Sequence, residues 1–342
     1  FPINQAAELS AGMGELNGSH YTNYPPINQL CFLVAAIFSS KSILGSVVVM
    51  RLLIIFADIG IIFIGKKILE KLNMPTNRIF WYALNPFIII ELTGNLHFEP
   101  VMLFFLLLSI YLLLHKRIGF AAAAIACSIS VKLIPLLFLP LFYQWFTKKE
   151  DLFRDGIINL VSFYGIILGT FMLLFFPFYS SELIDNYMNS VGLWFRSFEF
   201  NASFYYIFRE IGYLFRGYNE IAIIGKIIPI LTITFLGVIT FFRKNKTPQE
   251  LMTAMLFALS FYYFTTTTMH PWYLATLIVL SVFTTYRFPI IWSVVIILSY
   301  AAYSNESFQE NNMLLATEYL IVYGYLIWEL FYEKKSNFKK LF

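Results

Sequence analysis

Long apolar runs separated by short polar segments dominate the chain from residue 43 onward. A bilayer core of roughly 30 Å needs about 20 helical residues, and backbone groups in lipid must be paired within their own segment. The pattern therefore predicts an all-α, polytopic bundle of about eleven transmembrane helices. The expected spans are 43–65, 79–92, 100–114, 118–131, 133–146, 157–178, 221–242, 251–268, 272–286, 288–303 and 313–332. The apolar stretch 29–40 is too short to span, and we expect an interfacial helix there.

Composition supports a membrane protein. Hydrophobic residues make up 59% of the 342 residues and charged residues only 13%, whereas soluble domains carry about 25% charged residues. A water-soluble fold of this length could not bury so much apolar side chain. Cys31 and Cys127 lie in apolar stretches and form neither a disulfide framework nor a metal-binding spacing. We expect no metal and no nucleic-acid partner.

Basic residues alternate between successive loops. They follow the first, third, fifth, seventh, ninth and eleventh predicted spans, and these loops hold 17 of the 24 Lys and Arg residues. The positive-inside rule makes these loops cytoplasmic. The outer segments are then 1–42, 93–99, the turn near Lys132, 179–220, 269–271 and 304–312. We divide the chain into an outer loop with an interfacial helix, 1–42, and a transmembrane domain, 43–342, with a large outer loop at 179–220.

Two outer segments precede predicted helices. Tyr24-Pro25-Pro26 fixes the backbone just before the interfacial helix, as either a rigid rim or a simple helix-entry turn. The segment 91–100 places Glu91, Asn95, His97 and Glu99 within nine residues. Such groups can transfer protons or bind sugar hydroxyls, or they can form a solvated loop before the next helix. We favour a functional role because polar groups near lipid depth are costly.

A lysine interrupts two apolar segments at Ser128-Ile-Ser130-Val-Lys132-Leu-Ile-Pro135. Lys132 either snorkels to lipid phosphate or points into a polar cavity, where a cation suits a phosphate ligand. We favour the cavity, and we expect replacement of Lys132 by alanine to slow turnover without affecting expression.

A hydroxyl-rich run, Thr265–Thr268, precedes His270-Pro271-Trp272-Tyr273 at the outer edge of a predicted span. His270 is a candidate for contact with a phosphate or sugar. Trp272 and Tyr273 either stack on a sugar ring or belong to the aromatic belt of the interface.

Two charged residues lie inside the first predicted span. Arg51 and Asp58 are seven residues apart and share one helix face, about 10 Å apart along the axis. This is too far for a direct salt bridge, so each needs another partner. We favour structural pairing with neighbouring helices over a role in function.

These four outer segments resemble, in their order and spacing, the GT-C superfamily of membrane glycosyltransferases. The likeness is to bacterial polyprenol-phosphate-mannose-dependent mannosyltransferases and to the enzyme that adds the first mannose to glycosylphosphatidylinositol. It extends over about residues 20–290. The motifs that carry it are Tyr24-Pro25-Pro26, Gly94-Asn95-x-His97-x-Glu99-Pro100, Lys132 in Ser-Val-Lys-x-x-Pro, and His270-Pro271-Trp272-Tyr273.

The resemblance implies a GT-C-like, inverting enzyme that transfers a sugar, expected to be mannose, from a polyprenyl-phosphate donor. The acceptor is a glycan or lipid on the non-cytoplasmic face, and membrane lipid is the surrounding partner. No cofactor is implied, and the chain has no phosphate-cradling glycine loop. Compact loops and the lack of disulfide cysteines favour a bacterial cytoplasmic membrane, with the site facing the periplasm or exterior.

The resemblance also assigns residues. For the donor phosphate we expect Lys132 and His270, helped by Arg196 or Arg209 from the outer loop. For sugar or acceptor contacts we expect His97 and Glu99. The full candidate substrate-binding set is Tyr24, Pro25, Asn95, His97, Glu99, Lys132, Arg196, Arg209, His270, Trp272 and Tyr273.

The main catalytic acid of such enzymes lies in the first outer loop, before the Tyr-Pro-Pro segment. Upstream of Tyr24 this chain offers only Glu8 and Glu15, in no such context. We therefore expect the acid, together with the first spans, to lie upstream of Phe1, so that this fragment alone is inactive. Within the chain, Glu99 is the weaker catalytic candidate.

Two other classes remain open. A transporter or lipid flippase would also have many spans, but it would place charged residues near the midplane and break helices in paired halves. A non-catalytic membrane scaffold would need neither Lys132 nor the cluster at 91–99. The concentration of polar residues at one face favours surface chemistry over passage.

Overall fold

A computed structural model describes residues 6–19, 21–39, 41–147, 153–196, 198–305 and 308–333, without the side chains of residues 6, 15–17, 153, 193–196, 332 and 333. Lys148, Lys149, Lys334, Lys335, Lys339 and Lys340 of the predicted cytoplasmic loops lie outside these ranges. The described residues form helices and one isolated bridge between Phe200 and Thr268. The predicted all-α fold is confirmed. The elements are α1 (Ala6–Gly18), α2 (Pro26–Phe38), α3 (Ile43–Lys71), η1 (Thr76–Ile79), α4 (Phe80–Ala83), α5 (Pro86–Ile88), η2 (Ile89–Gly94), α6 (Glu99–Leu114), α7 (Ile118–Ile129), η3 (Ile134–Leu141), α8 (Phe142–Phe146), α9 (Phe153–Phe175), η5 (Phe176–Phe178), α10 (Leu183–Arg196), α11 (Phe204–Arg216), α12 (Ile221–Phe242), α13 (Pro248–Thr265), η6 (Pro271–Tyr273), α14 (Leu274–Val282), α15 (Phe288–Val295), η7 (Ile296–Ser304), α16 (Asn312–Trp328) and η8 (Glu329–Glu333).

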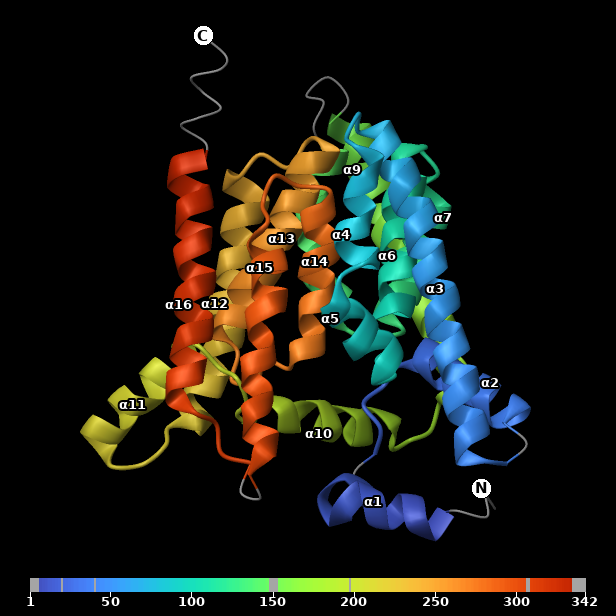
Figure 1. Cartoon of the computed structure of the whole chain (residues 1–342). Coiled ribbons are helices and arrows are strands. Elements are labelled where there is room, and N and C mark those ends of the chain that lie inside the picture. Colours follow the sequence, from blue (N-terminus) through green and yellow to red (C-terminus); the bar gives the residue numbers. More distant parts are fainter. Residues whose placement is uncertain are drawn as a thin grey trace.

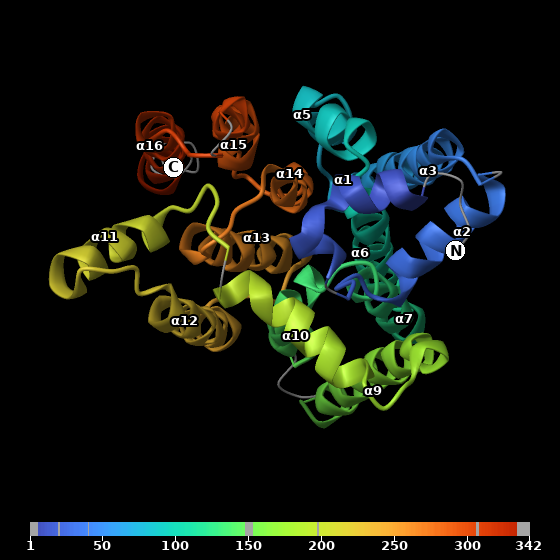
Figure 2. The same ribbon diagram turned by 90° about the horizontal axis from the view of Figure 1, so that it is seen from below.

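Two groups of helices stand side by side with roughly parallel axes (Figure 1). One group contains α3, α6, α7 and α9, and the other contains α12 to α16. At one end of the bundle α1, α10 and α11 lie across the helix axes. Seen from that end, α10 crosses from one group toward the other (Figure 2). The segments predicted to face outward are therefore gathered at one end, which we call the site end.

Four helices are long and apolar enough to cross a membrane, and a bent helix pair adds a fifth if it counts as one span. They cover Ile43–Lys71, Arg154–Phe178, Ile221–Phe242 and Asn312–Phe331, in agreement with four of the predicted spans. Among the described residues, other predicted spans are represented by shorter apolar helices such as Ile118–Ile129, Ile134–Phe146 and Phe288–Ser304. Shorter helices replace several of the predicted spans because they are surrounded by protein, where a helix does not need to match the bilayer. In α14, for example, every residue is buried.

The predicted continuous helix over 79–92 is wrong. The segment divides into η1, α4, α5 and η2, with a break at Asn85. Asn85 caps the next turn because its side-chain oxygen accepts a hydrogen bond from the Phe87 N–H at 3.0 Å, and Pro86 occupies the first helical position. The residues Pro86–Gly94 then meet α6 at an angle of 113°.

Close packing fixes α6 in the centre of its group. The Phe104 ring lies over Gly60 of α3, where an added Cβ would come within 2.5 Å of the ring. On another side, the alanine-rich α7 approaches closely enough for the Ser109 hydroxyl to donate to the Ala121 carbonyl at 2.8 Å. Small residues permit such approach between membrane helices. The first residue of α6, Glu99, is held in place by this packing.

Candidate functional site

The sharp bend before α6 is stabilised by hydrogen bonds from α3. Arg51 Nε donates to the Thr93 carbonyl at 3.0 Å, and Arg51 Nη2 donates to the Gly94 carbonyl at 3.1 Å. These carbonyls end η2, so the arginine satisfies groups that the bend would leave unpaired. Asp58 accepts the Tyr82 hydroxyl at 2.7 Å. The predicted structural role of both intramembrane charges is confirmed.

The loop between η2 and α6 presents the residues of segment 91–100. Leu96 adopts a left-handed conformation with φ 60°, which reverses the chain within one residue. Asn95 Nδ2 donates to Glu91 Oε1 at 3.2 Å, and both lie on the η2 side of this turn. Asn95 therefore supports Glu91, while His97 and Glu99 follow the turn and belong to the α6 side.

The Tyr24-Pro25-Pro26 segment is anchored on the lysine turn. The Ile27 N–H donates to the Ser130 carbonyl at 2.8 Å. Pro25 precedes the first residue of α2, so the helix begins where the prolines predict. This contact brings together segments that are about a hundred residues apart, and it sets the Tyr24 ring beside Lys132.

Lys132 forms a buried ion pair with Glu99. Its ammonium contacts Glu99 Oε1, and the side chains are 12% and 2% exposed. The Lys132 Nζ also lies 5.7 Å from the centroid of the Tyr24 ring. Burial opposes the charge of Lys132, but the Glu99 carboxylate raises its pKa above the usual value, so the lysine remains a cation. Glu99 Oε2 has no hydrogen-bond partner among the described residues.

The aromatic side of the site is a stack of four rings from three separate segments. His97 and Trp272 are parallel within 17°, with centroids 3.9 Å apart, and His270 and Trp272 within 8°, 4.4 Å apart. Phe200 continues the stack at 5.4 Å from His270. Trp272 therefore stacks on two imidazoles. Its stacking on a sugar ring stays a prediction.

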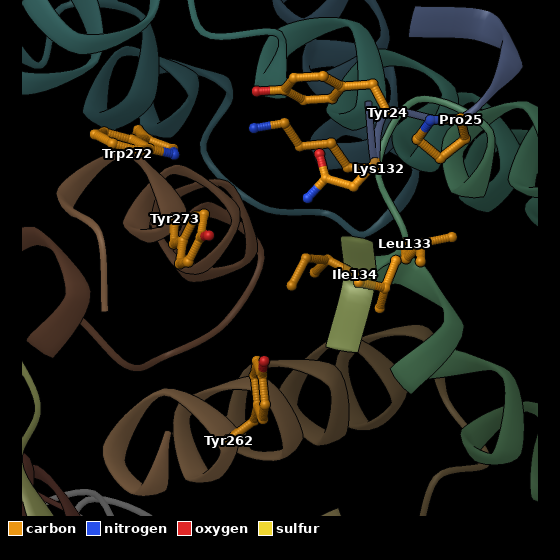
Figure 3. A pocket seen from close by; sticks show the side chains of 10 residues that line it. Tyr24, Pro25, Lys132, Leu133, Ile134, Tyr262, Trp272 and Tyr273 are labelled. Carbon is orange, nitrogen blue, oxygen red and sulfur yellow. The ribbon is translucent and has the colours of Figure 1, made fainter. Parts of the chain in front are cut away.

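A cavity of about 220 Å³ lies between these parts. Figure 3 shows the Lys132 amine beneath the Tyr24 ring, and it shows the Trp272 nitrogen and the Tyr262 and Tyr273 hydroxyls turned toward the same space. Tyr273 thus takes part through its hydroxyl. The described residues that line the cavity are Asn23, Tyr24, Pro25, Lys132, Leu133, Ile134, Val191, Tyr262, Trp272 and Tyr273.

Both histidines of the stack are neutral at physiological pH. Burial lowers the pKa of His97 to about 3, with Lys132 and His270 adding to the effect. Burial and the nearby Lys132 ammonium lower the pKa of His270 to about 4. A neutral imidazole can both donate and accept a hydrogen bond. The cation of the site is therefore Lys132, while the histidines supply uncharged polar contacts.

Of the two arginines predicted as helpers, Arg209 does not line this cavity. Arg209 of α11 pairs with Glu199 at 2.8 Å and with Glu210 at 3.0 Å. Burial would raise the pKa of Glu199, but hydrogen bonds from Tyr205, Arg209 and Asn219 lower it below the usual value. Arg209 is thus neutralised in its own cluster. The side chain of Arg196, at the end of α10, lies outside the described part of the chain.

Glu99 is also placed differently from its predicted contact with sugar. It lies behind Lys132 and does not line the cavity. Within the described residues, no group of three His, Cys, Asp or Glu side chains could hold a metal ion. The site therefore consists of one buried cation, tyrosine and indole donors, and two neutral histidines.

A buried cation beside uncharged polar groups is compatible with a glycosyltransferase, and a comparison with known families bears on this class. Residues 8–148 match the family alpha-(1->6)-mannopyranosyltransferase, N-terminal domain (MptA_B family). This match agrees with the predicted likeness to GT-C mannosyltransferases, and it supports a mannosyltransferase. No curated protein matches the chain.

The residues that match the mannosyltransferase family contain only one part of the site. The matched residues 8–148 include the Tyr24 segment, the bend before α6 and the Lys132–Glu99 pair. The ring stack around Trp272 comes mainly from later in the chain. The two halves meet where His97, from the mannosyltransferase segment, lies on Trp272.

Sequence reasoning missed two polar residues of the cavity. Tyr262 lies in the apolar helix α13 and lines the cavity. Its position directly before Tyr263 is the only sign of it in the sequence of that helix. Asn23 lies directly before Tyr24, and its place in the Tyr-Pro-Pro segment could have indicated it. Both are recognisable as site residues once the fold brings them to Lys132.

Proposed function

We propose that this mannosyltransferase uses a polyprenyl-phosphate mannose donor and that Lys132 binds the donor phosphate in the cavity. The observation that carries the proposal is a buried ammonium at the edge of a cavity that also receives hydroxyl and indole N–H groups. A lysine behaves as a point charge with three donors. One of them contacts Glu99, which leaves two for phosphate oxygens.

The size of the cavity fits a compact headgroup. Its volume of about 220 Å³ is below the range of about 300–1,000 Å³ that is common for drug-sized ligands. A single sugar phosphate matches this size better than an oligosaccharide does. The acceptor glycan or lipid would then approach from the open side rather than lie inside the cavity.

An apolar groove beside the cavity supports a lipid-linked donor. It lies between α2 and the end of α9 and has a volume of about 660 Å³. Its lining includes Pro26 and Ile27, which directly follow the cavity residue Pro25. A phosphate at Lys132 could therefore extend an apolar tail into this groove without crossing a polar surface. A soluble nucleotide sugar would leave the groove unused.

The chemistry follows from these charges. In the proposed displacement, the acceptor oxygen forms a bond to the anomeric carbon while the bond from that carbon to the phosphate oxygen breaks. The anomeric centre is thereby inverted, and the lipid phosphate leaves with the electron pair. Lys132 and the neighbouring N–H and O–H donors stabilise the additional negative charge. No nucleotide or metal cofactor is part of this proposal, which places the site at the periplasmic or exterior face of a bacterial inner membrane.

The proton of the acceptor hydroxyl needs a base. Among the described residues that line the cavity there is no carboxylate. Glu99 contacts the phosphate ligand Lys132 rather than the cavity, so within the chain it is best described as the residue that positions Lys132. The base is therefore not assigned to any described residue of the cavity wall.

The proposal is tested by sugar transfer in membranes that contain the protein expressed from its complete gene. The substrates are radiolabelled polyprenyl-phosphate mannose and a mixed pool of glycan and lipid acceptors. We expect transfer by the wild type and by Lys66→Met, since Lys66 is an exposed lysine at the opposite end of α3, but not by Lys132→Met. Movement of intact donor across the membrane without glycosidic bond formation would instead establish a flippase.

A further inference from the structure

A buried asparagine outside the cavity holds an unusual position. Asn201, between α10 and α11, is fully buried and left-handed, with φ 46°. Its N–H donates to Glu310 Oε1 at 2.6 Å, and its Nδ2 donates to Glu318 Oε1 at 3.1 Å. Its carbonyl accepts the Tyr319 hydroxyl at 2.6 Å. Asn201 is thus fastened to α16 and to the segment that leads into it.

The anchor on α16 is a carboxylate without a basic partner. Glu318 is fully buried, and besides Asn201 it accepts the Trp292 indole N–H at 2.8 Å. No salt bridge to Glu318 is formed within the described part of the chain. A buried carboxylate is costly, and each neutral donor that reaches it is correspondingly important. The bond from Asn201 is therefore one of the few that stabilise this group.

The residue before Asn201 continues the connection to the cavity. The Phe200 N–H donates to the Thr267 carbonyl at 3.1 Å, and the Met269 N–H donates to the Phe200 carbonyl at 2.8 Å. These bonds enclose the chain that enters His270. The Phe200 ring also lies on His270, which lies on Trp272 of the cavity wall.

We propose that Asn201, held by Glu318, is a positioning residue that fixes the His270–Trp272 wall of the cavity. Two consecutive residues connect α16 to this wall. Asn201 forms hydrogen bonds to α16, and the Phe200 backbone forms hydrogen bonds to the loop before His270. The His270 ring is confined between Phe200 and Trp272 only while this segment stays in place. Its effect on sugar transfer rests on the proposed function, whereas the mechanical coupling does not.

The coupling is tested by the reactivity of His270 toward diethyl pyrocarbonate, which acylates neutral imidazoles. The purified full-length protein in detergent is treated near pH 7, and modification of each histidine is followed by peptide mass spectrometry. Asn201→Gly keeps the left-handed backbone accessible but removes the amide. We expect it to accelerate acylation of His270 about tenfold, the factor expected when one buried hydrogen bond is lost from a local opening equilibrium.

Glu318 supplies a matched pair of variants. Both donors contact Oε1, and glutamine keeps this acceptor, so Glu318→Gln should leave the His270 rate unchanged. Glu318→Leu removes the acceptor and should raise the rate as Asn201→Gly does. His115 is exposed and directly follows α6, at the end of that helix away from Glu99, so it serves as a reference for reagent concentration and its rate should stay constant in all three variants.

An unchanged His270 rate in Asn201→Gly and Glu318→Leu would overturn the proposal. Faster proteolysis throughout the protein in the same variants would also overturn it, because it would reveal general loosening rather than a local connection. Where transfer is measurable, Glu318→Leu should raise the donor KM, and Glu318→Gln should keep the wild-type value. A selective rise at His270 in a protein that transfers no mannose would preserve the coupling and reject the proposed function.

Discussion

Replacing Lys132 by methionine tests the cation of the site and the stability of its ion pair together. Methionine keeps a similar length and removes the ammonium. Glu99, only 2% exposed, would then be a buried charge without its cation. Removing one partner of a buried ion pair costs about 3–5 kcal/mol. We therefore expect Lys132→Met to lower the free energy of unfolding by about that amount and the transfer rate by about 10²–10³-fold.

The structure thus revises the expectation that loss of Lys132 leaves expression intact. A second variant separates folding from chemistry. In Lys132→Met/Glu99→Leu both charges are gone, and a hydrophobic pair of similar volume is often neutral for stability. This double variant should recover most of the lost unfolding free energy while transfer stays at the level of the single variant.

The assay combines thermal unfolding in detergent with single-turnover transfer from radiolabelled donor. Lys66→Met replaces an exposed lysine in the C-terminal part of α3. It controls for the loss of any lysine. Wild-type turnover in the double variant would refute a role of Lys132 in phosphate binding. Wild-type stability in Lys132→Met would refute the buried ion pair itself.

Three further predictions follow from the neighbouring groups. The pKa values of His97 and His270 in the folded protein, about 3 and 4, lie below the unfolded value of about 6.5, so the unfolded state binds protons first. Unfolding free energy should be constant above about pH 7 and should fall as the pH drops from about 6.5 toward 4; an equal slope in His270→Asn would contradict this origin. Trp272→Phe keeps the ring stack but removes the indole N–H, and we expect transfer to fall about tenfold with little change in melting temperature; unchanged transfer would exclude the N–H as a ligand. Arg51→Leu leaves the carbonyls that end η2 without a donor, and we expect the melting temperature to fall by several degrees. Arg51→Lys should recover part of this loss. Equal melting temperatures of Arg51→Leu and wild type would contradict the anchoring role.

The residues that sequence reasoning identified share one property. Lys132 interrupts an apolar run, and Tyr24 and His270 each precede proline in a short motif, so all three stand out locally. Each of them lies at or beside the cavity in the structure. The break at Asn85-Pro86 carried an equally local signal, because asparagine followed by proline is typical of a helix start. That signal was overridden by the apolar run around it.

Other features depend on contacts that no local pattern contains. Trp272 stacks on two histidines, one of which lies about 175 residues earlier in the chain. Arg209 was expected to be available for a phosphate. Instead it forms an ion pair with Glu199, ten residues before it. Glu318 lies within a predicted span and acquires its importance only through Asn201. Long-range packing therefore decided which polar groups face the cavity.

The charges of the site indicate how it would distinguish donor from product. Lys132 and Glu99 cancel each other, and both histidines are neutral, so these four side chains carry no net charge. A phosphodiester donor brings one negative charge, and departure of the lipid phosphate brings a second. That second charge would appear near His270, and a nearby anion raises the pKa of an imidazole. Neutral histidines beside a buried lysine thus favour the state in which the bond to the sugar has broken, which is the state that catalysis must stabilise.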